Sequence, residues 1–145
     1  HVTISHKRRR MISSSKQAKA AIGKECIDIP AGGDPGFQCF VGTRLVGSST
    51  ATRFVNGGRY VVTFIGAERI GLKDEMTGDE FETTPDAISK HCLLAWAMVY
   101  NKVQGSTERG SVMLHDTSSP YFKKCHLYVG LSRVTDGSHV FVARD

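Results

Sequence analysis

The segment from Asn101 to Thr107 contains residue types that could contact a phosphate. It reads Asn-Lys-Val-Gln-Gly-Ser-Thr. Backbone N–H groups beside a glycine such as Gly105 can approach an oxyanion closely, and the hydroxyls of Ser106 and Thr107 add further donors. An ordinary turn has the same composition, so the segment by itself permits a phosphate site without requiring one.

A single arginine, Arg133, ends an apolar segment that reads Leu-Tyr-Val-Gly-Leu-Ser over residues 127–132. A planar guanidinium suits a phosphoryl group that is being transferred, because it spreads positive charge over several phosphate oxygens and lowers the barrier. The alternative is a surface ion pair with Asp116 or Asp136. Residue types alone favour the ion pair, so a catalytic role needs further context.

Positive charge gathers near the start of the chain, although the net charge of the whole chain is only +5. Residues 1–24 hold seven basic residues and no acid, whereas residues 68–82 hold six acids and two basic residues. The run Lys7-Arg8-Arg9-Arg10 either binds phosphates or forms the solvated start of a helix. A cation cluster at a helix N-terminus opposes the helix dipole, which favours a bound anion there.

Several classes of site are not indicated by the sequence. No GxxxxGK[ST] loop is present, since Gly23-Lys24 is followed by Glu25, and no acidic pair on an apolar strand would hold magnesium. The chain therefore cannot close an ATP site alone. The four cysteines form no CxxC pair, so we expect buried free thiols in a reducing compartment and no metal. The six histidines have no metal-ligand spacing, and we interpret them as packing or surface residues.

The elements that must position these residues can be read from periodicity and turn signals. We expect helices over 7–22 and 87–99, a loop over 28–37 and turns at 56–58 and 76–79. Residues 121–132 fit a helix, but the alternation of Leu127, Val129 and Leu131 leaves this segment ambiguous. We expect strands over 2–4, 37–41, 43–46, 59–65, 69–74, 80–84, 111–115 and 140–143. Strands and helices alternate at both ends of the chain, which predicts a parallel α/β core. The short strands between them predict an inserted small antiparallel barrel or meander.

Beyond these patterns, three segments resemble the motifs of superfamily 1B helicases of the RecD and PIF type. Residues 94–107 resemble motif V, residues 127–135 resemble motif VI, and residues 2–9 resemble motif IV more loosely. In addition, residues 54–62 resemble the Asn-Gly strand of the SH3-like barrel of that family. The motifs follow in the family's order over nearly the whole chain, which begins at His1 without an initiator Met and looks like an excised piece of a longer protein.

The resemblance implies a fold and a division into domains. Residues 1–48 and 91–145 would form domain 2A, a RecA-like parallel sheet flanked by helices. Residues 49–90 would form the inserted 2B domain, a small antiparallel SH3-like β-barrel. The implied partners are ATP with Mg²⁺, single-stranded DNA and an N-terminal RecA-like domain of the same protein, which would bind most of the ATP and Mg²⁺. With no membrane span and no signal peptide, the expected location is intracellular.

The resemblance also implies roles for individual residues. Arg133 and Arg9, or a neighbour of Arg9 in the same run, would be the catalytic arginines that face the γ-phosphate. Gln104 and Gly105 would sense the nucleotide. The strand's phosphates would be contacted by the remaining residues of the motif V loop: Asn101, Lys102, Ser106 and Thr107.

Three positions depart from the family pattern. Val99 stands where Thr or Ser is usual, Asn101 where His is usual, and Gly130 where Ala is usual. An Asn side chain can still donate to a phosphate, but a Val side chain cannot. Three hypotheses stay open: a fragment of an ATP-dependent DNA helicase that is inactive alone, a non-catalytic nucleic-acid-binding or interaction module derived from one, and a stand-alone SH3-like adaptor with flanking helices. The third fits residues 50–90 but leaves Arg133 and its neighbours unexplained.

Overall fold

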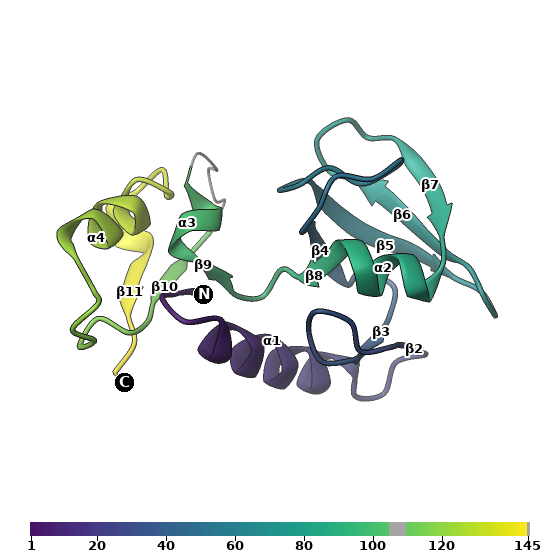
Figure 1. Cartoon of the computed structure of the whole chain (residues 1–145), viewed down its shortest axis with the longest axis horizontal. Coiled ribbons are helices and arrows are strands. Elements are labelled where there is room, and N and C mark those ends of the chain that lie inside the picture. The colour runs from purple at the N-terminus through teal and green to yellow at the C-terminus, as the bar shows by residue number, and fades with distance from the viewer. Residues whose placement is uncertain (105–109, 145) are drawn as a thin grey trace. The chain divides into compact units, whose positions relative to one another are not determined.

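The computed structural model describes residues 1–104 and 110–144, which fall into two units (Figure 1). Unit 1 combines residues 1–12 with residues 97–145, and unit 2 comprises residues 13–96. Helix α1 (His6–Ala21) begins in unit 1 and ends in unit 2. Gly23, with φ of 74°, follows the helix and takes the left-handed conformation expected of a helix stop signal.

Unit 1 is built on a four-stranded sheet in which every pairing is parallel. Its order is β11-β10-β1-β9, formed by β1 (Val2–Thr3), β9 (Met98–Val99), β10 (Val112–Leu114) and β11 (Val140–Val142). Val2 lies opposite Leu114 on one side and opposite Met98 on the other. The prediction of a parallel α/β core is therefore confirmed, and it arises because the strands are short apolar runs separated by helical segments.

The helices of unit 1 are the start of α1, the single turn α3 (Tyr100–Val103) and α4 (Lys124–Leu131), and the 3₁₀ turn η1 (Gly137–His139) precedes β11. The apolar core of the unit includes Tyr100 and Val103 from α3, and Val129 from α4 packs against it. The buried core consists of Val2, Tyr100, Val103, Val112 and Leu114. Gly130 lets α4 approach β10 closely, since a Cβ there would lie 2.5 Å from the Cδ2 atom of Leu114.

Unit 2 contains a five-stranded antiparallel sheet of order β7-β6-β5-β4-β8. Its strands are β4 (Arg44–Gly47), β5 (Arg59–Ile65), β6 (Ile70–Asp74), β7 (Glu80–Thr83) and β8 (Cys92–Leu94). A separate antiparallel pair joins β2 (Ile27–Ile29) to β3 (Phe37–Cys39), with the expected loop between them. The antiparallel prediction is confirmed, while the likeness to an SH3 barrel and the 49–90 domain boundary stay predictions.

The predicted helix over residues 87–99 is wrong in its second half. Helix α2 (Pro85–His91) begins where the Thr84 side chain accepts a hydrogen bond from the N–H of Ala87, and it ends at Cys92, whose backbone is extended. Residues 92–94 then form β8 and pair with β4, with Leu94 opposite Leu45. The apolar spacing fits both a helix and a buried strand, and the available partner strand decided between them.

A buried amide ties three segments of unit 2 together. The side chain of Gln17 is 1% exposed. Its Nε2 atom donates to the carbonyl oxygen of Gln38 (2.7 Å) and to Oγ1 of Thr43 (3.1 Å). Its Oε1 atom accepts from Nε1 of Trp96 at 2.8 Å. This one side chain therefore connects α1, the end of β3 and the segment that leaves β8.

Gln17→Leu is expected to lower the free energy of unfolding by about 2 kcal/mol, because the two acceptors and the one donor that it serves lose their partner. Urea denaturation of the two proteins measures the difference. Gln38→Leu is the matched control, since Gln38 takes part through its backbone oxygen and its own side chain is exposed. Equal stability of Gln17→Leu and the wild type would show that the network contributes nothing.

The cysteines only partly follow the expectation of buried thiols. Cys39 and Cys92 are buried, Cys26 is half-buried and Cys125 is exposed, and all four are free. Burial raises the pKa of the Cys39 thiol to about 11 and that of Cys92 to about 12, so both stay protonated and unreactive near neutral pH. Within the described residues, no helix is long and apolar enough to cross a membrane.

Candidate functional site

The order of the parallel sheet singles out one place in unit 1. Strand β1 leads on to β9 on one side of it, whereas its other neighbour β10 leads on to β11 in the opposite direction. Two adjacent strands whose connections diverge define a topological switch point, and open α/β sheets bind ligands beyond the carboxyl ends of such strands. The residues that follow β1 and β10 are therefore the first candidates for a site.

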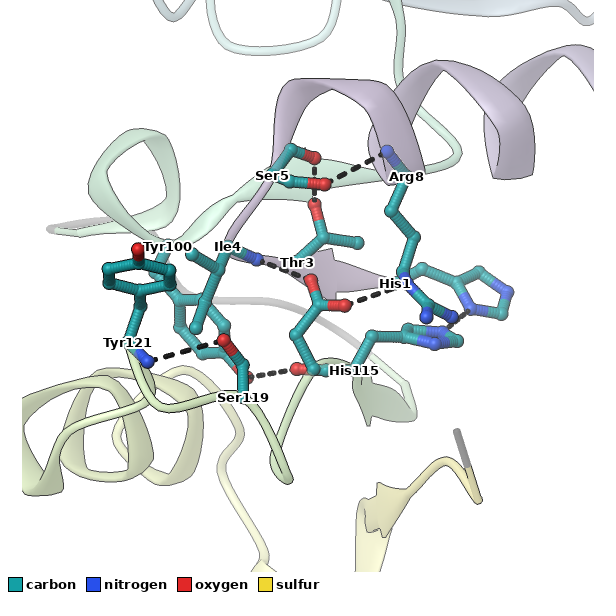
Figure 2. Close-up of polar contacts among 10 residues, drawn as sticks. His1, Thr3, Ile4, Ser5, Arg8, Tyr100, His115, Ser119 and Tyr121 are labelled. Atoms are coloured by element: carbon teal, nitrogen blue, oxygen red, sulfur yellow. Dashed lines mark hydrogen bonds and ion pairs between the residues drawn. The ribbon is translucent and has the colours of Figure 1, made fainter.

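Asp116 lies at this switch point and contacts both neighbouring segments through Ile4 and Arg8, the two residues that Figure 2 labels there. Its Oδ2 atom accepts from the backbone N–H of Ile4 at 2.9 Å, just beyond β1. Its Oδ1 atom forms an ion pair with Nε of Arg8 at 2.7 Å, in the first turns of α1. The side chain of Asp116 is only 12% exposed and that of Arg8 is 36% exposed, so the pair is partly shielded from water.

Hydrogen bonds between residues close in sequence hold the chain in place on both sides of this ion pair. The N–H of Arg8 donates to Oγ of Ser5 (3.1 Å), which caps the start of α1. The N–H of Ser119 donates to the carbonyl oxygen of Asp116 at 3.0 Å, and the N–H of Tyr121 donates to Oγ of Ser119 at 3.2 Å. The loop after β10 is thus folded back on itself.

A histidine pair lies in the same network and was not predicted from the sequence. Nδ1 of His1 is 2.8 Å from Nε2 of His115, and the hydroxyl of Tyr100 donates to the carbonyl oxygen of His115 (Figure 2). One ring nitrogen must donate and the other accept, so the pair shares one proton. The residues are 114 positions apart and no spacing rule joins them; the parallel pairing of β1 with β10 does.

The four residues of the basic run lie in the first turns of α1 and differ in how far they are buried. Arg9 is 3% exposed and lies inside unit 1, while Lys7 and Arg10 are exposed. Arg8 is the member of the run that reaches Asp116 at the switch point. A carboxylate of the chain itself thus lies beside Arg8, and the phosphate expected at the basic run stays a prediction. The role of Arg9 at a nucleotide stays a prediction.

The predicted phosphate segment begins beyond the carboxyl end of β9. Asn101 and Lys102 are exposed on α3, and Gln104 is exposed directly after it. Gly105, Ser106 and Thr107 lie outside the described residues. Val99, by contrast, is 8% exposed and pairs with Thr3 inside the sheet, so its side chain is not presented to a ligand.

Arg133 follows α4, the helix that carries the chain back from β10 toward the start of β11. Its Nε atom donates to the carbonyl oxygen of Val129 (3.3 Å), and its Nη2 atom donates to Oγ of Ser132 (2.9 Å). The two carboxylates considered as partners have other contacts: Asp116 pairs with Arg8, and Asp136 accepts from the N–H of Ser138. The hydrogen bonds from Ser138 lower the pKa of Asp136.

The chemistry available at this edge is recognition of an anion by cations and amides. Among residues 1–104 and 110–144, no group of three His, Cys, Asp or Glu side chains is placed to hold a metal ion. Arg8, Lys102 and Gln104 instead follow the carboxyl ends of neighbouring strands, where a phosphate-bearing ligand of an α/β sheet is expected.

Comparison with known proteins gives matches among solved structures only. No protein-family model and no curated protein sequence matches the chain. A Bacteroides Pif1 bound to ssDNA matches with a TM-score of 0.70 at 20% identity, over 98% of this chain and 39% of that one. A Bacteroides Pif1 in complex with ADP-AlF3 and ssDNA matches with a TM-score of 0.68 at 20% identity, over 99% and 40%.

A Pif1 helicase from Candida albicans also matches, with a TM-score of 0.62 at 13% identity, over 99% of this chain and 45% of that one. The chain therefore spans less than half the length of these proteins. Identities this low establish shared architecture and leave chemistry open. The resemblance read from the motifs is confirmed at the level of the fold: this chain has the fold of the corresponding part of Pif1-type superfamily 1B helicases.

Proposed function

We propose that this chain is the C-terminal part of an ATP-dependent DNA helicase, which couples ATP hydrolysis to translocation along a single strand and to duplex unwinding. The observation that carries the proposal is the shared fold with Pif1 helicases over 98% of the chain, in which the motif-like segments follow strands of the parallel sheet. Residues 1–48 and 91–145 would form domain 2A, and residues 49–90 would form the 2B insertion.

The proposal divides the ATP site between two domains. An N-terminal RecA-like domain of the same protein would supply the Walker loop and the acid that binds Mg²⁺. This chain would supply Arg133 and an arginine of the basic run, Arg9 or its neighbour Arg8, to the γ-phosphate. Gln104 and Gly105 would then connect the nucleotide to the strand-binding residues. Alone, the chain is expected to hydrolyse no ATP.

The single-stranded DNA would be held mainly through its phosphates. Asn101 and Lys102 are exposed on α3, and Ser106 and Thr107 follow in the chain. Contacts of this kind make single-strand binding sensitive to salt and largely indifferent to base sequence. Two of the structural neighbours support this mode, since those Bacteroides Pif1 proteins are bound to ssDNA.

Titration of single-stranded DNA against the full-length protein at several salt concentrations tests this mode of binding. We expect the affinity for ssDNA to fall steeply as the salt concentration rises. In a separate assay of ATP hydrolysis, we expect ssDNA to stimulate turnover. Lys102→Gln is expected to reduce the slope of log K against log salt by about 0.7, the value for one lost phosphate contact on a single strand. Lys73→Gln, an exposed lysine on β6, is the matched control.

An unchanged salt slope in Lys102→Gln would remove Lys102 from the strand-binding surface. Absence of any ATP hydrolysis by the full-length protein, with or without DNA, would contradict the helicase proposal as a whole. These two outcomes are separate, because the first concerns one cation and the second concerns the motor.

A second candidate function is a non-catalytic nucleic-acid-binding or interaction module that keeps the RecA-like shape. It is favoured by Val99, whose side chain is buried in β9. The family that the chain resembles has a hydroxyl at this position, which contacts the DNA. The reading frame upstream of His1 distinguishes the two candidates. A GxxxxGKT loop there supports the enzyme, and its absence supports the module.

A further inference from the structure

The contacts of Asp116 join the loop after β10 to the end of β1 and to the start of α1. We propose that Asp116 is a positioning residue, whose carboxylate aims the guanidinium of Arg8 at the nucleotide phosphates from the switch point of the sheet. This inference rests on the proposed function for its ligand. Its structural content, that Asp116 holds Arg8, can be measured without that ligand.

Each oxygen of the Asp116 carboxylate contacts one of these two segments. One holds the backbone N–H of Ile4 at 2.9 Å, and the other holds Nε of Arg8 at 2.7 Å. The first contact fixes the carboxylate relative to the sheet, because Ile4 directly follows β1. The second fixes the arginine relative to the carboxylate. A charged group that is held in place by a backbone hydrogen bond suits the orientation of a cation.

The backbone of Asp116 is held in an unusual conformation. Its φ is 59°, and it is the non-glycine residue with positive φ among those that the structure describes. A left-handed conformation is uncommon for a residue with a Cβ and persists where the surroundings impose it, which is frequent at functional sites. Here it accompanies the turn after β10 that brings the carboxylate onto Ile4 and Arg8.

The contact at Nε fixes the orientation of the Arg8 guanidinium. A guanidinium has five N–H donors in one plane, and Nε carries one of them. A carboxylate at Nε therefore holds the plane of the whole group, and a planar cation of this kind suits phosphate oxygens. A long side chain that is held in this way loses less conformational freedom when a phosphate arrives.

Burial favours Arg8 over Arg9 as the arginine that meets the ligand. The Arg8 side chain is 36% exposed, whereas Arg9 is 3% exposed. Arg8 also contacts Asp116 at the switch point between β1 and β10, which is the part of the sheet where a ligand is expected. Within the run Lys7-Arg8-Arg9-Arg10, the ion pair with Asp116 thus indicates Arg8 as the arginine that meets the ligand.

Asp116→Asn separates the two contacts of the carboxylate. The amide oxygen still accepts from Ile4, but the negative charge that holds Arg8 is gone. In the full-length protein we expect kcat for ATP to fall about tenfold with KM changed less than twofold, since an aimed cation acts mainly on the transition state. In an Arg8→Gln background, Asp116→Asn is expected to cause no further loss. Asp28→Asn, an exposed acid on β2, is the control.

Two outcomes would overturn the assignment in this assay. One is an unchanged kcat in Asp116→Asn. The other is an equal, multiplicative loss from Asp116→Asn with and without Arg8, because a merely structural carboxylate would act independently of the arginine.

A folding measurement on the 145-residue chain keeps the inference testable if the full-length protein hydrolyses no ATP. The unfolding equilibrium constants of the wild type, Asp116→Asn, Arg8→Gln and the double variant form a cycle in urea. We expect a coupling of about fivefold between the two positions, in the range of a partly shielded ion pair. Additive effects would show that Asp116 does not hold Arg8, whatever the fate of the proposed function.

Discussion

Arg133→Ala is expected to lower ATP turnover by the full-length protein by about 10³-fold, while single-strand binding stays within about twofold of the wild type. An arginine that meets the γ-phosphate neutralises charge as it develops in the transition state, and loss of such a residue costs at least this much. Binding is spared because the strand would be held by the residues after β9, a different segment of unit 1.

The structure adds a condition to this prediction. The Arg133 guanidinium lies on the end of α4, where it donates to the carbonyl oxygen of Val129 and to Oγ of Ser132. If Arg133 meets the γ-phosphate as proposed, the phosphate must replace these two contacts.

Steady-state ATP hydrolysis with saturating ssDNA measures the effect of Arg133→Ala, and fluorescence anisotropy measures strand binding. Arg69→Ala is the matched control, because Arg69 is exposed in unit 2 and pairs with Glu82 at 3.1 Å. Thermal melting of Arg133→Ala checks that the lost contacts to α4 leave the fold intact. Turnover within tenfold of the wild type would remove the catalytic role from Arg133.

Gly47→Ala is expected to destabilise unit 2 by about 3 kcal/mol, the upper range for an added methyl group in a packed site. A Cβ on Gly47 would lie 2.0 Å from the carbonyl oxygen of Val55 and 3.0 Å from its carbonyl carbon. These are backbone atoms, so the clash cannot be relieved by a side-chain rotation.

The surrounding hydrogen bonds leave little room for the backbone to move instead. The N–H of Gly47 donates to the carbonyl oxygen of Gly58, and the N–H of Gly57 donates to the carbonyl oxygen of Gly47, both at 2.8 Å. A shift large enough to admit the methyl group would break this pair of bonds at the end of β4. The close approach therefore requires glycine at position 47.

Urea denaturation of the 145-residue chain measures the loss in Gly47→Ala. Gly33→Ala is the matched control, since a Cβ at Gly33 would meet no heavy atom within 4 Å and its φ is not in the left-handed region. We expect the control to change stability by less than about 1 kcal/mol. A Gly47→Ala protein as stable as the wild type would show that the two segments separate easily.

The sequence was sufficient for most of the elements because their signals are local. Gly57 and Gly78 stand at the expected turns with φ of 83° and 79°, and β5 occupies the predicted strand over residues 59–65. The alternation of strands and helices at the ends predicted the parallel sheet of unit 1. Such features depend on residue type and near neighbours, which the sequence states directly.

The segment after His91 shows where local signals stop. Its apolar residues suit a helix by spacing, yet residues 92–94 form a strand because β4 offers a partner on which Leu94 packs against Leu45. Helix and strand differ little in intrinsic preference for such a run, so a contact between residues 49 positions apart along the chain outweighs it.

The sequence was enough to pick out the motif residues Arg9, Asn101, Lys102, Gln104 and Arg133. It did not show which side chains lie beside them in the fold. Ile4 and Asp116 are 112 residues apart, and only the parallel pairing of β1 with β10 brings that carboxylate to Arg8. The element types, the turns and the motif-bearing segments thus follow from the residues in order along the chain. Which carboxylate meets which arginine follows from the folded arrangement instead, because strand register joins side chains that no spacing along the chain relates.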